Sequence, residues 1–68
     1  MNKTNRLKEI RVNRNISVSQ LSREAEISER YLRFIESGEK NPSLKTAKKI
    51  AKCLNLGVDD IFCLWNEL

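Results

Sequence analysis

The 68-residue chain has no histidine, and its only glycines are Gly38 and Gly57. The absence of histidine removes the side chain that most often acts as a general base near neutral pH. Two isolated glycines do not make the glycine-rich loop that cradles a phosphate, and no nucleophile stands beside a plausible base. We therefore expect that the protein is not an enzyme.

Cysteine is scarce as well, with Cys53 and Cys63 as the only two. A zinc site would have to find all its ligands among thiolates and carboxylates, so we expect no metal ion. The sequence also implies no cofactor and no small-molecule ligand. In a cytosolic chain, the two thiols are expected to be small apolar fillers rather than a disulfide.

Long apolar runs are missing, and no segment approaches the ~20 residues of a membrane span. The stretch from Met1 to Arg14 is polar and charged, unlike a secretion signal. Repeats, low-complexity segments and interior linkers are missing too. We expect a single domain over residues 1–68, located in the cytoplasm.

The chain has an excess of basic residues, with 13 Lys and Arg against 9 Asp and Glu and a net charge of +4. This balance suits a polyanionic partner, although many small domains carry as much charge for solubility alone. With 40% hydrophobic residues the chain can form one small core. Domains this short often gain stability from a partner subunit, which favours a dimer.

The most informative segment, residues 16–36, predicts two amphipathic helices separated by a tight turn. Ser17 and Gln20 form the Ser-x-x-Gln pattern of a capping box. The residues that follow recur at the spacing of one helix face: Val18, Leu21 and Ala25. The first of the two helices is therefore expected to bury this stripe against its neighbours.

The second helix is predicted from Ser28 to Ser37, with Ser28 as its N-cap and Gly38 at its C-terminal end. Leu32 and Ile35 are expected to face inward, joined by part of Tyr31. The outward face is expected to comprise Glu29, Arg30, Arg33, Phe34 and Ser37. Two helices held at a steep angle by a short turn form a helix-turn-helix, whose second helix fits a DNA major groove about 12 Å wide.

Periodicity predicts three further helices, over about residues 4–13, 44–54 and 58–67. Ser43 is the expected N-cap of the middle one. Its lysines face outward, as either a solvated face or a DNA contact, and its buried stripe is expected to comprise Leu44, Ala47, Ile50, Ala51 and Leu54. Phe62 is expected to turn toward the core.

With these elements in place, the chain resembles the phage-repressor and Cro-like helix-turn-helix family, also called the xenobiotic-response-element regulators. The resemblance runs from about Arg6 to Phe62 and is most specific in residues 35–44, IESGEKNPSL. It implies an all-α, compact, five-helix lambda-repressor-like domain. It further implies that the helix from Ser28 to Ser37 binds operator DNA.

Residue by residue, the resemblance places Glu29 and Arg30, and later Phe34, where family members reach base edges. Arginine can bind guanine bidentately, glutamate can accept from cytosine, and a ring can pack on a thymine methyl. Phe34 has an alternative role in covering the core or contacting a partner, and the arginines could be ordinary solvated side chains. Contacts to the DNA backbone are expected from Ser17, Ser28, Tyr31, Arg33, Ser37, Lys40, Asn41 and Lys45.

The resemblance also implies an ion pair between Arg11 and Glu36. Two positions depart from the family pattern. Many relatives have a glutamine at Val18 that helps to anchor the motif to phosphate, and many have glycine at Glu26, where a left-handed backbone would cost about 1 kcal/mol.

We thus interpret the chain as a sequence-specific transcriptional regulator, a repressor that binds a palindromic operator as a homodimer. The predicted dimer interface is one stripe of the last helix, formed by Ile61, Trp65 and Leu68. The alternative is that Trp65 folds back over the fourth helix. Two other functions remain: a controller or antitoxin-type autoregulator, and a protein-interaction module that uses the same fold without DNA.

Overall fold

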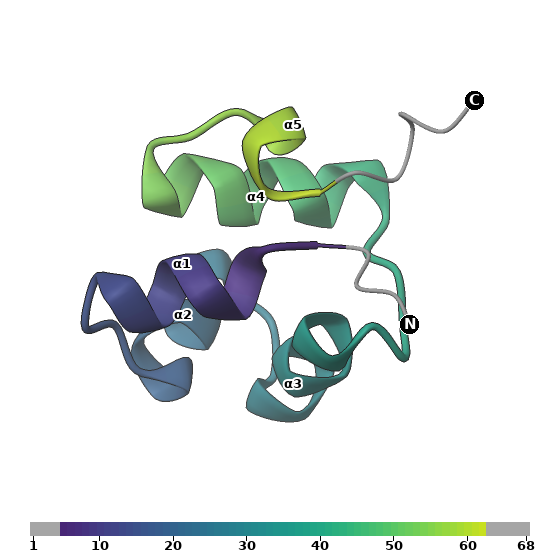
Figure 1. The fold of residues 1–68 in the computed structure, drawn as a ribbon. Coiled ribbons are helices and arrows are strands. Elements are labelled where there is room, and N and C mark those ends of the chain that lie inside the picture. The colour runs from purple at the N-terminus through teal and green to yellow at the C-terminus, as the bar shows by residue number, and fades with distance from the viewer. Residues whose placement is uncertain (1–4, 63–68) are drawn as a thin grey trace.

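The computed structural model describes residues 5–62, and all of its regular elements are helices (Figure 1). They are α1 (Leu7–Asn13), α2 (Val18–Ala25), α3 (Glu29–Ser37), α4 (Leu44–Leu54) and α5 (Val58–Ile61). Figure 1 shows α4 and α5 on one side of the molecule and α1, α2 and α3 on the other. Within residues 5–62, no helix has the length and apolar character needed to cross a bilayer.

Three of the helices begin at a serine whose hydroxyl oxygen accepts a hydrogen bond from a backbone N–H in the first turn. The pairs are Ser17 with Gln20 at 2.9 Å, Ser28 with Tyr31 at 3.0 Å, and Ser43 with Thr46 at 3.1 Å. These caps confirm the predicted starts of α2, α3 and α4. The Ser17 N–H does not bond to the Gln20 side chain, so the reciprocal half of the capping box is not formed; the Gln20 side-chain N–H donates to the Glu24 carboxylate at 3.4 Å.

The turn between α2 and α3 depends on a left-handed residue. Glu26 has φ 61° and ψ 41°, the conformation expected at the position where relatives carry glycine. Its backbone N–H donates to the Arg23 carbonyl at 3.2 Å, and its carboxylate lies 3.2 Å from Lys49 Nζ on α4. Gly38, at φ 85°, ends α3 as predicted.

The core lies where α4 packs on the other helices. It comprises Leu7, Leu21, Ala25, Leu32, Ile35, Ala47, Ile50, Ala51, Leu54, Ile61 and Phe62. Phe62 is 1% exposed, as expected. One member of the predicted stripe is wrong: Leu44, the first residue of α4, is 54% exposed, whereas Pro42 two residues earlier is buried.

The first helix begins later than predicted, at Leu7 rather than near residue 4. Asn5 is extended and forms an antiparallel bridge with Phe62. The Asn5 side chain accepts from the Leu7 N–H at 2.9 Å and donates to the Ile35 carbonyl at 3.0 Å. A buried side chain therefore caps α1 from two residues upstream and ties it to α3.

The last helix ends earlier than predicted, at Ile61 rather than near residue 67. Phe62 is extended, at φ −111° and ψ 134°, because it pairs with Asn5. Ile61 is completely buried, so its predicted place in the dimer interface is wrong. The other two residues of that interface, Trp65 and Leu68, lie outside the described residues, as does Cys63.

Candidate nucleic-acid interface

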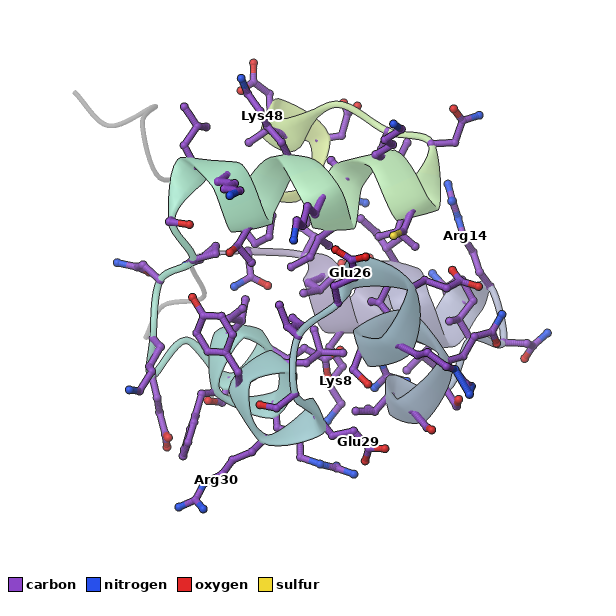
Figure 2. The ribbon with its side chains drawn as sticks, turned by 180° about the vertical axis from the view of Figure 1, so that it is seen from behind. Lys8, Arg14, Glu26, Glu29, Arg30 and Lys48 are labelled. Carbon is purple, nitrogen blue, oxygen red and sulfur yellow. The ribbon has the colours of Figure 1, made fainter. Side chains whose placement is uncertain are left out.

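The outer face of α3 carries the charged residues that the sequence singled out. Glu29, Arg30 and Arg33 are exposed, and Phe34 is half-buried beside them. Figure 2 shows Arg30 pointing away from the body of the protein, on the side opposite Lys48 of α4. These charged side chains are therefore accessible to a partner.

The charges on this face are not equivalent. Arg33 Nη2 lies 3.8 Å from the Glu29 carboxylate, in an exposed pair one helical turn long. Within residues 5–62, no carboxylate lies at ion-pair distance from Arg30. Its guanidinium lies over the Phe34 ring, 5.8 Å from the centroid. Arg30 thus presents its positive charge outward with less local compensation than Arg33.

The C-terminal end of α3 brings further groups to the same region. Ser37 Oγ donates to the Phe34 carbonyl at 3.1 Å and accepts from the Glu39 N–H at 3.3 Å. Lys40 and Asn41 follow, both exposed. The Lys40 N–H also donates to the Phe34 carbonyl, at 3.2 Å, so this loop is held against the helix.

The remaining candidates for backbone contacts lie at helix starts. Ser17 and Ser28 are exposed, and each uses its hydroxyl oxygen as a cap, which leaves the hydroxyl proton free to donate to a phosphate. Lys45 is exposed in the first turn of α4, and Tyr31 is half-buried on α3. Helix N-termini attract anions through their free N–H groups and dipole, which suits such contacts.

A nearly buried ion pair fixes the orientation of α3. Arg11 Nε lies 2.6 Å from Glu36 Oε2, and the two side chains are only 11% and 6% exposed. A second guanidinium nitrogen donates to Glu36 Oε1 at 3.2 Å, and a third donates to the Ile16 carbonyl at 2.8 Å. The pair is bidentate and hydrogen-bonded further, the arrangement that makes a buried pair rigid.

Sequence reasoning missed one basic residue beside this interface. Lys8 of α1 lines a recess of about 290 Å³ between α1 and α3, together with Arg11, Arg33, Glu36 and Ser37. Lys8 and Arg33 line the same recess because the Arg11–Glu36 pair joins α1 to α3 there. No local pattern around Lys8 signals it.

Residues 5–62 contain no cluster of three or more side chains suited to hold a metal ion. Cys53 is half-buried against the core. Burial raises the pKa of its thiol, and the nearby Glu24 carboxylate raises that pKa further. The thiol is therefore kept protonated near neutral pH, as suits a packing residue.

Comparison with known proteins identifies the family. A family model described as helix-turn-helix matches residues 7–61. The chain belongs to the helix-turn-helix family. A relative from Archaeoglobus fulgidus, named as an uncharacterized HTH-type transcriptional regulator, is 39% identical over 91% of this chain and 87% of its own length. Another of that name, from Methanocaldococcus jannaschii, is 38% identical over 85% of this chain and 88% of its own.

Solved helix-turn-helix structures share the fold. The N-terminal DNA-binding domain of SinR from Bacillus subtilis is 31% identical, with a TM-score of 0.72 over 79% of this chain and 80% of that domain. The restriction-modification controller C.AhdI from Aeromonas hydrophila is 27% identical, with a TM-score of 0.77 over 81% of this chain and 83% of its own. The expected all-α fold is confirmed. The matched relatives are transcriptional regulators, and the shared fold is that of a regulator DNA-binding domain rather than of an enzyme, as the sequence predicted.

Proposed function

We propose that the protein binds double-stranded DNA in a sequence-specific manner, with α3 as the recognition helix. The observation that carries this proposal is the exposed, basic outer face of α3, held in a fixed orientation by the Arg11–Glu36 pair. A structure of SinR in complex with DNA, 31% identical and with a TM-score of 0.73, supports the same use of the fold.

In this proposal, Glu29 and Arg30 reach base edges from the first turn of α3, with Phe34 beside them. The backbone contacts come from Ser17, Ser28, Tyr31, Arg33, Ser37, Lys40, Asn41 and Lys45. In protein–DNA complexes a few side chains usually contact the base edges and determine specificity, while contacts to the phosphates position the protein.

We further propose that the protein is a cytoplasmic repressor and that residues 1–68 form one helix-turn-helix DNA-binding domain. A homodimer would occupy a palindromic operator and block polymerase. A controller-type autoregulator is the second candidate, favoured by the likeness to C.AhdI. The third, an interaction module without DNA, predicts no affinity for polyanions.

The salt dependence of DNA binding tests the proposal. Neutralising ~4–8 phosphates releases counterions, so the affinity for duplex DNA should fall a hundredfold or more between low and moderate salt. Fluorescence anisotropy with a labelled duplex selected from a random pool measures this slope. A flat slope, or no retention on heparin, would contradict DNA binding.

Two alanine variants separate base reading from phosphate binding. Arg30→Ala should weaken the preferred operator by about 1–3 kcal/mol and relax selectivity at one base pair per half-site. Lys45→Ala should weaken all sequences alike. If Arg30→Ala kept the preferred sequence and affinity of the parent, its role in base reading would be wrong.

A further inference from the structure

Two cationic side chains from different parts of the chain lie over the ring of Phe34. The Arg30 guanidinium lies 5.8 Å from the ring centroid, and Lys40 Nζ lies 5.7 Å from the same centroid. Both distances fall within the range of a cation–π interaction. Both cationic side chains are exposed, whereas the ring is half-buried.

Two separate features of the backbone produce this arrangement. Arg30 and Phe34 are one turn apart on α3, so their side chains are neighbours on the helix surface. Lys40 lies beyond the helix and is brought back by the left-handed Gly38, at φ 85°, and by the 3.2 Å hydrogen bond from its N–H to the Phe34 carbonyl. The ring is half-buried, so part of its surface is packed against the protein while the rest is open to the two cations.

The ring changes the electrostatics of this end of α3. Two cations that converge on one spot repel each other, and without a partner their flexible side chains would spread apart in solution. The face of an aromatic ring is negative, so it attracts both without neutralising either. Unlike a carboxylate, it leaves the full positive charge of Arg30 and Lys40 available to an anion.

We propose that Phe34 is a positioning residue of the DNA interface, whose ring holds Arg30 and Lys40 in their binding-ready orientations before DNA arrives. This inference rests on the proposed DNA binding. Its physical basis is that side chains already ordered in the free protein lose less freedom on binding. It assigns specificity to the geometry of Arg30 rather than to a contact between the ring and a thymine methyl.

The free protein provides a test that does not depend on DNA. An aromatic ring shifts the NMR signals of protons that lie over its face, so the side-chain methylene protons of Arg30 and Lys40 should resonate upfield of their ordinary positions. The shifts should vanish in Phe34→Leu, which keeps an apolar side chain at the site, and persist in Phe34→Tyr. Unshifted signals in the parent would overturn the proposal.

A double-mutant cycle then tests the effect on binding. Two exposed cation–π contacts correspond to roughly a tenfold change in Kd, so Phe34→Leu should weaken operator binding by about that factor and Phe34→Tyr should restore it. In an Arg30→Gln background, measured at low salt, the same change should cost only about threefold. In an Arg33→Gln background the full effect should remain, because the cations over the Phe34 ring within residues 5–62 are Arg30 and Lys40.

Operators in which each thymine is replaced in turn by deoxyuridine separate this role from direct base contact. Replacing a thymine by deoxyuridine should lower the operator affinity of the parent no more than it lowers that of Phe34→Leu. The positioning role would be overturned if Phe34→Leu reduced operator affinity equally in the parent and in Arg30→Gln. It would also be overturned if one deoxyuridine replacement abolished the loss of affinity that Phe34→Leu causes. A parent that binds no DNA while showing the NMR shifts would instead contradict the proposed function.

Discussion

Among individual side chains, Arg11 and Glu36 matter most for the placement of the interface. They come from α1 and from the C-terminal half of α3, and they are the least exposed ion pair within residues 5–62. The pair joins the helix predicted to read DNA to the helix that supports the motif. Its loss should therefore affect folding before it affects any direct contact with DNA.

Replacing Arg11 with alanine should lower the free energy of unfolding by about 3–5 kcal/mol, because it leaves the Glu36 carboxylate buried without a partner. Urea denaturation followed by circular dichroism measures the change. Arg6→Ala is the matched control, since the Arg6–Glu9 pair is 58% and 59% exposed and should contribute at most about 1 kcal/mol. Equal stability of the two variants would show that burial does not matter here.

The left-handed residue in the turn allows a second prediction. Glu26→Gly should be more stable than Glu26→Ala by about 1 kcal/mol, because alanine retains the strain at φ 61° and glycine does not. Both variants lose the contact with Lys49, so the comparison isolates the backbone. Thermal unfolding of the two proteins measures the difference, and an alanine variant as stable as the glycine variant would contradict the assigned turn.

At the next level, the helices differ in how their ends are determined. The starts of α2, α3 and α4 depend on local serine caps, which the sequence displays openly. The start of α1 and the end of α5 depend on each other, because Asn5 pairs with Phe62 and the Arg6 N–H donates to the Ile61 carbonyl at 2.8 Å. The two ends of the described chain thus pair with each other, and this pairing determines where α1 begins and α5 ends.

Asn5→Ala should therefore destabilise the protein by about 1–3 kcal/mol, because it leaves the buried Leu7 N–H without its acceptor and removes one of the two donors to the Ile35 carbonyl, which keeps the Gly38 N–H. Asn13→Ala is the control, since Asn13 is exposed at the end of α1. Chemical denaturation provides both values, and hydrogen exchange at the Leu7 amide should rise selectively in Asn5→Ala. An Asn5→Ala protein as stable as Asn13→Ala would contradict this role.

For the molecule as a whole, the proposed binding to a palindrome requires that two recognition helices be brought together on DNA. The burial of Ile61 removes one residue from the predicted interface, and Trp65 and Leu68 remain as its candidates. A two-fold dimer that binds adjacent major grooves requires recognition helices about 34 Å apart and half-site centres ~10 base pairs apart.

If Trp65 forms this interface, Trp65→Ala should be largely monomeric under conditions in which the parent is a dimer, because the interface loses its largest apolar side chain. Sedimentation velocity at micromolar concentration measures the state of each protein. Val12→Ala is the control, since Val12 is an exposed apolar residue of α1, 53% accessible. A folded Trp65→Ala protein that stays dimeric and binds the palindrome as before would refute this interface.

Local chemistry was sufficient to predict much of this protein. The caps at Ser17, Ser28 and Ser43 and the glycine at the end of α3 depend on residues within a few positions of one another, so they are visible in the sequence. The outward face of α3 follows from helical periodicity in the same way. Family resemblance added the Arg11–Glu36 pair, which periodicity alone does not reveal.

The tertiary structure decided the features that join distant segments. Whether the last helix continued past Ile61 depended on a bridge to Asn5, and a chain that pairs with an extended partner has to leave the helix. The place of Lys40 over the Phe34 ring depended on the turn at Gly38 and on the loop that follows it. The local sequence pattern does not predict such contacts, because they form only when the packed core brings together segments that lie far apart along the chain.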